Sequence, residues 1–136
     1  MLRNLSTRKR QNGFTLIELI VVMAIIAVLS LVAVPVFTST IRAAKEAALK
    51  EDLHVMRNAI QSYTMDKNKA PQSLDDLVQS GYLSAIPVDP MTNSADTWQT
   101  DTDDTYSDLD QTESGITDVH SGSDQIGSDG QPYSSW

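Results

Sequence analysis

The chain has 136 residues, a length within the range of a single domain, and a formal net charge of −8. It contains no cysteine, which excludes disulfide bonds, thiol catalysis and cysteine-type zinc sites, and its two histidines are too few for most zinc enzymes. The charge is uneven: four basic residues and no acid stand in positions 1–13, whereas residues 71–136 hold acids but no Lys or Arg. Because such an acidic segment repels nucleic acid and anionic lipid, we expect no nucleic-acid partner.

A long apolar run follows the basic residues. Residues 14–37 carry one charge, Glu18, and as a helix they would extend about 36 Å, enough to cross a hydrocarbon core of about 30 Å. The basic residues ahead of the run place positions 1–13 on the cytoplasmic side. An ordinary signal peptide or signal anchor is the alternative, but the run is longer than most signal-peptide cores and carries a carboxylate near its cytoplasmic end. We expect a single-pass transmembrane helix over residues 14–37.

Glu18 calls for a partner. A charge within a membrane segment costs a few kcal/mol, and no cation stands one helical turn away in the sequence. The partner would therefore come from elsewhere, either a free amino terminus or another subunit.

Residues 8–18, with the sequence RKRQNGFTLIE, resemble the processing motif of type IV prepilins and type II secretion pseudopilins. In that family a membrane aspartyl peptidase cuts after the glycine and methylates the new amino-terminal residue. The resemblance implies a cleaved leader over residues 1–13, cleavage between Gly13 and Phe14, and N-methylation of Phe14. It also implies that Glu18 pairs with the amino terminus of a neighbouring subunit and so fixes the axial stagger between helices.

Pro35 stands near the end of the apolar run and removes one helical hydrogen bond. By itself a proline there is consistent with the end of the membrane helix. In the pilin family, however, a proline at the matching position marks where the helix bends or melts during filament packing, and the resemblance gives Pro35 this assembly role.

Residues 38–67 are predicted to form the amphipathic second half of the same helix. Apolar residues recur at alternating spacings of four and three, which makes one continuous stripe: Leu49, Leu53, Met56, Ile60 and Tyr63. Glu46 and Lys50 fall on the other faces, in the acid-first spacing that favours a surface pair. The cations of this segment are the natural partners of the acidic residues further on, within or between subunits: Arg42, Lys45, Lys50 and Arg57.

Residues 68–136 are expected to form a small globular head. Ser73 and Asp76 predict the start of a short helix that stops at Gly81. Residues 115–121 alternate like a strand, residues 97–100 are its expected partner, and residues 101–110 the loop between them. Packed on the long helix, these strands would bury a set of aromatic and aliphatic side chains: Trp98, Ile116, Val119 and Trp136.

This order of elements resembles the major pseudopilin of type II secretion, the G component, although Met91 and Thr92 stand where much of that family has a Trp-Gly pair. The expected fold is α+β and type IV pilin-like: a long amino-terminal transmembrane and assembly helix packed against a small carboxyl-terminal head with short antiparallel strands and long loops. Residues 121–130 are rich in carboxylates, hydroxyls and glycines, the oxygen ligands that calcium prefers. Major pseudopilins bind calcium in the corresponding loop, which suggests these ligands: Asp124 and Asp129, with Asp118 and Ser123 behind them. A solvated acidic loop is the alternative.

No enzyme is expected, because no nucleophile motif, phosphate loop or metal triad accompanies His120, which we interpret as a strand-edge histidine. The resemblance implies a structural subunit of the bacterial inner membrane, with a cytoplasmic leader and a periplasmic head, that polymerises into a periplasmic pseudopilus. Its expected partners are further copies of itself, minor pseudopilins, the prepilin peptidase, an inner-membrane assembly platform and the lipid bilayer. One alternative is the major pilin of a type IV pilus, although many such pilins carry a disulfide loop. Another is a calcium-binding module on an uncleaved signal anchor.

Overall fold

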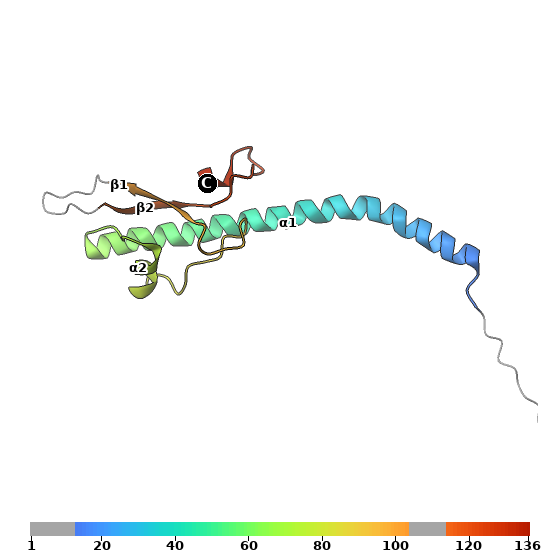
Figure 1. Cartoon of the computed structure of the whole chain (residues 1–136), viewed down its shortest axis with the longest axis horizontal. Coiled ribbons are helices and arrows are strands. Elements are labelled where there is room, and N and C mark those ends of the chain that lie inside the picture. The colour runs from blue at the N-terminus through green and yellow to red at the C-terminus, as the bar shows by residue number, and fades with distance from the viewer. Residues whose placement is uncertain (1–12, 104–113) are drawn as a thin grey trace, which may run out of the picture. The chain divides into compact units, whose positions relative to one another are not determined.

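The computed structural model describes residues 13–103 and 114–136 (Figure 1). Its elements in chain order are α1 (Leu16–Lys67), α2 (Leu74–Gln79), β1 (Gln99–Asp103), β2 (Gly115–His120) and the 3₁₀ turn η2 (Tyr133–Ser135). The contacts divide the chain into two compact units, Met1–Ser39 and Thr40–Trp136, so that the long helix α1 contributes its first part to one unit and its second part to the other.

The first unit is the apolar part of α1. Thr15 caps the helix: its hydroxyl oxygen accepts a hydrogen bond from the backbone N–H of Glu18 at 3.2 Å, and its carbonyl accepts one from Leu19 at 3.2 Å. All its large apolar side chains are exposed, Phe14 to 85%. By length and composition, α1 is the one helix in the described residues that is long and apolar enough to cross a membrane.

Pro35 lies inside α1, which continues to Lys67. Pro35 therefore does not end the helix itself, and the alternative that it marks the end of the membrane-spanning part stays open. Just beyond it, the hydroxyls of Thr38 and Ser39 donate to the carbonyls of Pro35 and Val36, at 3.0 and 2.8 Å. A bend or an opening at Pro35 in a filament stays a prediction.

The second unit is built around one face of α1. The predicted stripe is confirmed, because all five of its side chains are at most 7% exposed: Leu49, Leu53, Met56, Ile60 and Tyr63. Three of the other elements add side chains to the same core: Leu77 from α2, Ile116 and Val119 from β2, and Tyr133 from η2. Figure 1 shows β1 and β2 running beside this part of α1.

The short helix α2 has the predicted boundaries. Ser73 and Asp76 form a reciprocal capping box, in which each side chain accepts a hydrogen bond from the backbone of the other. At the other end Gly81 adopts a positive φ of 82°, and the N–H of Tyr82 donates to the carbonyl of Leu77 at 2.9 Å. This is a Schellman ending, for which glycine is favoured because it has no Cβ.

The two strands pair antiparallel, with Gln99 opposite His120 and Asp103 opposite Gly115. The prediction of a strand over 115–121 is confirmed within one residue. The prediction that the loop begins at residue 101 is wrong, because β1 extends to Asp103 with a bulge between Asp101 and Thr102. An acidic strand is tolerated here because the side chain of Asp101 is 67% exposed and carries no burial cost. Residues 104–110 of the predicted loop lie outside the described residues.

The predicted burial of the head residues is largely confirmed. Ile116 and Val119 are at most 4% exposed and Trp98 is 9% exposed, with its indole N–H donating to the carbonyl of Pro87 at 2.8 Å. Trp136 is half-buried and packs against the same core. Its ring lies edge-on to that of Tyr133, with the centroids 5.0 Å apart.

Because α2, β2 and η2 share one core with the stripe of α1, truncating the stripe should loosen all three. Leu49→Ala removes a fully buried side chain and should destabilise the head by about 2–5 kcal/mol. Val55, on the same helix but 42% exposed, supplies the matched control Val55→Ala, which should cost much less. Thermal unfolding of the full chain in detergent, followed by near-UV circular dichroism, measures both; equal losses of stability would contradict this packing.

Candidate functional site

The residues of the predicted processing site lie at the start of α1. Gly13 and Phe14 precede the helix and are exposed, and no atom lies within 4 Å of the position that a Cβ would take at Gly13. Glu18 stands exposed in the first turn, where a carboxylate is favoured by the positive end of the helix dipole. In the described part of the chain no basic side chain contacts the Glu18 carboxylate. The pairing of Glu18 with an amino terminus stays a prediction. The exposed carboxylate is accessible to such a partner.

Beyond Glu18 the helix presents an uninterrupted apolar surface. A shallow groove of about 330 Å³ runs along it, lined only by small and branched apolar side chains: Val21, Ala24, Ile25, Val28 and Leu29. An apolar surface of this extent is unstable in water and needs lipid or other protein to cover it. The first unit therefore has the surface of a membrane and assembly element.

In the second unit, charged side chains of α1 hold the segment after β2. Arg42 donates to the carbonyl of Ile126, and the ammonium of Lys50 lies 4.6 Å from the ring centre of Trp136. The guanidinium of Arg57 donates to Asp118 at 2.6 Å and to the carbonyls of Val119 and Trp136 at 3.0 and 2.8 Å. The prediction that these cations meet the acidic region is thus confirmed for Arg57 and Asp118.

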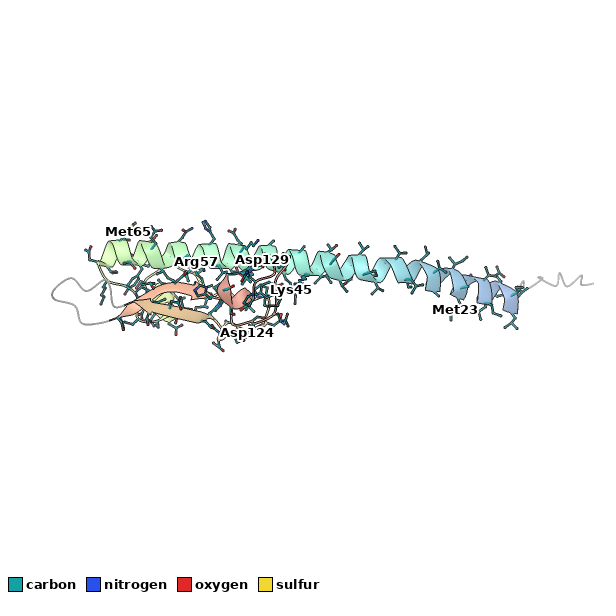
Figure 2. The ribbon with its side chains drawn as sticks, turned by 90° about the horizontal axis from the view of Figure 1, so that it is seen from above. Met23, Lys45, Arg57, Met65, Asp124 and Asp129 are labelled. Atoms are coloured by element: carbon teal, nitrogen blue, oxygen red, sulfur yellow. The ribbon has the colours of Figure 1, made fainter. Side chains whose placement is uncertain are left out.

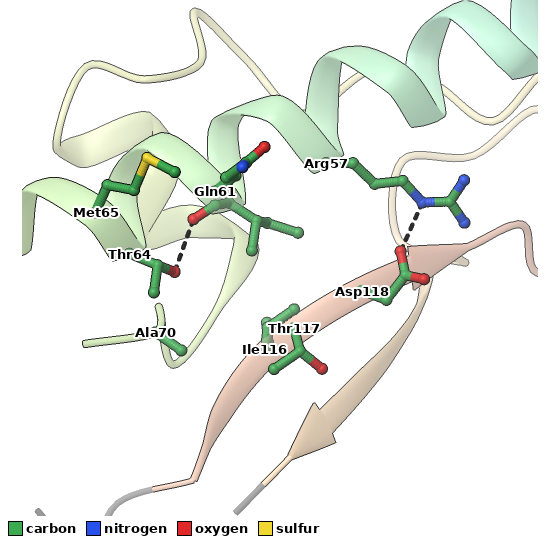
Figure 3. A pocket seen from close by; sticks show the side chains of 9 residues that line it. Arg57, Gln61, Thr64, Met65, Ala70, Ile116, Thr117 and Asp118 are labelled. Carbon is green, nitrogen blue, oxygen red and sulfur yellow. Dashed lines mark hydrogen bonds and ion pairs between the residues drawn. The ribbon is translucent and has the colours of Figure 1, made fainter. Parts of the chain in front are cut away.

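Figure 3 shows the Arg57–Asp118 pair at one end of a groove of about 540 Å³ between α1 and β2. Burial raises the pKa of Asp118, but the hydrogen bonds from Arg57 and from the backbone N–H of Val119 outweigh it and lower the pKa below its usual value. The pair therefore links the strand to the helix as an ion pair at neutral pH.

Glu46 is the buried charge of this surface, only 7% exposed. Its Oε1 accepts hydrogen bonds from the hydroxyl of Tyr133 at 2.7 Å, the N–H of Ser128 at 3.0 Å and Nε of Arg42 at 3.3 Å. Its Oε2 accepts one from the hydroxyl of Ser128 at 2.5 Å. The hydrogen bonds from Ser128 and Tyr133 lower the pKa of Glu46 from 4.5 to about 2.

The prediction of a Glu46–Lys50 surface pair is wrong. Glu46 turns to Arg42 and to the residues after β2, and Lys50 lies over Trp136 instead. The physical reason is the position of Glu46 three residues before Leu49, which places it in line with the buried apolar stripe rather than on a solvated face. That spacing was the signal in the sequence that this carboxylate is buried.

Asp89 is a second buried carboxylate that the sequence analysis did not single out. It is 0% exposed, and its Oδ2 accepts from the hydroxyl of Ser121 at 2.6 Å and the N–H of Gly122 at 3.1 Å. Its Oδ1 accepts from the N–H of Met91 at 2.8 Å, which forms a tight local turn. Asp89 thus ties the loop before β1 to the loop after β2.

The four predicted calcium ligands do not share one cluster. Asp118 pairs with Arg57, and Ser123 accepts weakly from the N–H of Gln125 at 3.4 Å. Asp124 accepts from the hydroxyl of Ser134 at 2.8 Å and Asp129 from the N–H of Gln131 at 2.9 Å, and Figure 2 shows Asp124 farther from α1 than Asp129. Within residues 13–103 and 114–136, no three acidic or histidine side chains come together as a metal site would require. Calcium binding stays a prediction.

His120 occupies the last position of β2. One ring nitrogen, Nδ1, lies 2.6 Å from the carbonyl oxygen of Trp136, and Nε2 lies 3.1 Å from Asp101. These contacts join the end of β2 to β1 and to Trp136, which gives His120 a structural role at the end of the strand.

An exposed apolar helix that carries a processing motif, followed by a small α+β head, defines a type IV pilin-like subunit. Residues 8–34 match the family described as the prokaryotic N-terminal methylation motif. Type II secretion system core protein G of Pseudomonas aeruginosa is 34% identical over 102 residues, which cover 63% of this chain and 72% of that protein. The chain belongs to the family of type II secretion system core protein G.

Relatives with other names match a shorter part of the chain. Competence protein ComGC of Halalkalibacterium halodurans is 33% identical over 73 residues, covering 54% of this chain and 72% of that protein. Type IV major fimbrial protein FimA of Dichelobacter nodosus is 35% identical over 75 residues, covering 55% of this chain and 47% of FimA. No solved structure matches significantly.

The lowered pKa of Glu46 predicts a loss of stability in acid. A group whose pKa is about 2 when folded and about 4.5 when unfolded contributes its full stabilisation above pH 4.5, and loses it as the pH falls towards 2. Glu46→Gln keeps the shape of the side chain but cannot titrate, so the difference in stability between the original chain and the variant should shrink over this range.

Unfolding midpoints of the full chain in detergent between pH 7 and pH 2 test this expectation. The pKa of Asp118 is also lowered, so its contribution to the stability of the protein falls in acid as well. Because Asp118 is present in both proteins, its contribution cancels when the original chain is compared with Glu46→Gln. Glu51→Gln, at an exposed position of the same helix, is the control. A difference between the original chain and Glu46→Gln that is constant with pH would contradict the assignment.

Proposed function

We propose that this chain is a structural subunit that polymerises into the periplasmic pseudopilus of a type II secretion system. The observation that carries the proposal is an exposed apolar helix, opened by the methylation motif of residues 8–34, in a chain with 34% identity to core protein G over most of the length of that relative. A helix with this surface has a stable place only in a bilayer or among copies of itself.

The proposed sequence of events begins in the inner membrane, with the leader in the cytoplasm and the head in the periplasm. The prepilin peptidase cleaves the exposed bond between Gly13 and Phe14 and methylates the new amino terminus. This creates a cation at the membrane surface, and Glu18 of a neighbouring copy supplies the anion that neutralises it. The assembly platform then adds subunits to the filament, with minor pseudopilins as further partners, and each added subunit raises the filament and pushes secreted protein outward.

The alternative of a type IV pilus is less well supported. FimA matches this chain over only 47% of its own length, whereas core protein G matches over 72%. A calcium-binding module on an uncleaved anchor is the third hypothesis, and it predicts that the amino terminus stays at Met1.

The decisive experiment for the function is complementation. Expression of this chain in a type II secretion strain that lacks core protein G should restore export of a secreted enzyme, whereas it should not restore twitching in a strain that lacks its major pilin. Restored twitching without restored secretion would favour the pilus instead.

Processing is tested at Gly13, which has open space around it. Gly13→Ala should still allow some cleavage, whereas a bulky residue such as Gly13→Leu should block it, because the peptidase must approach this bond closely. Intact mass spectrometry of the protein extracted from membranes, with the prepilin peptidase present, measures the cleaved fraction. Recovery of the uncleaved original chain under these conditions would reject the processing site.

Assembly is tested at Glu18. Glu18→Ala should be cleaved as efficiently as the original chain, but it should fail to assemble into filaments, since the new amino terminus would lack its counter-charge. Glu51→Ala removes an exposed acid from the second unit and is the control for charge alone. Normal filaments from Glu18→Ala would refute the pairing.

A further inference from the structure

We infer that residues 121–136 are fastened to the head without a metal ion, by the two buried carboxylates Glu46 and Asp89. Each of these carboxylates accepts several hydrogen bonds from residues of the loop. The inference concerns the loop alone and does not depend on the proposed function.

The chemistry of the groups that point inward carries the inference. The loop presents the hydroxyl of Tyr133 and both the N–H and the hydroxyl of Ser128 to Glu46. These are hydrogen-bond donors, and donors converge on an anion. A calcium ion is bound instead by six to eight oxygen lone pairs, which the carbonyl and carboxylate groups of a loop must turn towards it. The centre of this loop has the donor set for a carboxylate and not the acceptor set for a cation.

Burial strengthens these bonds. Tyr133 is 1% exposed and Glu46 7% exposed, so water does not compete for the carboxylate. Arg42 reaches the same carboxylate, which balances part of the buried charge, and it also donates to the carbonyl of Ile126 in the middle of the segment.

Asp89 repeats the arrangement at the other end of the loop. Its carboxylate accepts hydrogen bonds from the hydroxyl of Ser121 and from the N–H of Gly122, so here too the loop supplies donors. Thr97 packs so closely that a Cβ at Gly122 would lie 2.1 Å from the carbonyl oxygen of Thr97, which fixes the path of the backbone beside Asp89. The loop is therefore anchored near both of its ends.

The carboxylates predicted to ligate calcium already take part in hydrogen bonds or an ion pair. Asp124 and Asp129 each accept a hydrogen bond from within the loop, from Ser134 and Gln131, and Asp118 is paired with Arg57. The bonds of Asp124 and Asp129 stiffen the turns of the loop, and the pair of Asp118 with Arg57 links β2 to α1. Drawing them together around an ion would break these bonds, so the structure favours a loop that is complete without calcium.

The experiment compares full-length protein in detergent micelles with millimolar calcium chloride and with EGTA. Unfolding temperature and amide hydrogen exchange should be the same in both, with the N–H groups of Gly122 and Ser128 protected in each. Glu46→Ala should raise the exchange rate over residues 126–136 at least about tenfold and lower the unfolding temperature, again without any effect of calcium. Glu51→Ala removes the same charge from an exposed position of the same helix and should leave both unchanged.

Milder variants decide the matter if Glu46→Ala does not fold. Tyr133→Phe and Ser128→Ala each delete one hydroxyl that donates to Glu46, the first to Oε1 and the second to Oε2, and their effects should be non-additive when combined, because both donors serve one carboxylate. A rise in unfolding temperature with calcium, a loss of loop protection in EGTA, or equal exchange in Glu46→Ala and Glu51→Ala would each overturn the inference.

Discussion

The head depends on one face of one helix. The buried stripe of α1 from Leu49 to Tyr63 is the surface against which α2, β2 and η2 find their core contacts, and β1 is held through its pairing with β2. No other element could fold alone: α2 has six residues, well below the length at which an isolated helix is stable in water, and the two strands form a single ladder. The hydrophobic energy of the head therefore comes from covering α1, and the loops are long because they only need to bring short segments back to that face.

Charge then decides how the segment after β2 is held. Between Pro71 and Trp136 the chain offers acids but no Lys or Arg, so this segment cannot neutralise itself. Arg57 neutralises part of this negative charge through its ion pair with Asp118, and the ammonium of Lys50 packs over the ring of Trp136. Glu46 is paired with Arg42, and the other hydrogen-bond donors to Glu46, like those to Asp89, are neutral hydroxyl and amide groups. Among the described residues Lys45, Lys67 and Lys69 make no ion pair, which leaves them available to other copies in an assembly.

Periodicity and capping chemistry predicted the regular parts of this architecture. The spacing of Leu49, Leu53 and Met56, and the Ser73–Asp76 box, are local patterns whose physical meaning does not change with context. The sequence analysis went wrong where the outcome depended on contacts distant in the chain. The charge of Glu46 is typical of a surface residue and its position in the helix of a core residue, and the distant residues Ser128 and Tyr133 decide between the two. Asp89 gave no comparable signal, because a carboxylate between Val88 and Pro90 is ordinary in an exposed turn.

The two units differ in what their side chains contact. The methylation motif covers residues 8–34, whose large apolar side chains are exposed from Phe14 onwards. In the proposed function these side chains meet a bilayer and identical neighbours, whereas the residues that hold the head, from Arg42 onwards, contact one another. Buried pairs such as Glu46 with Ser128 can be exchanged for another fastening, a metal site included, as long as the loop still covers α1. We therefore expect the means of closing the loop to differ among relatives that share the same assembly helix, since the filament constrains the helix and only the fold of the head constrains the loop.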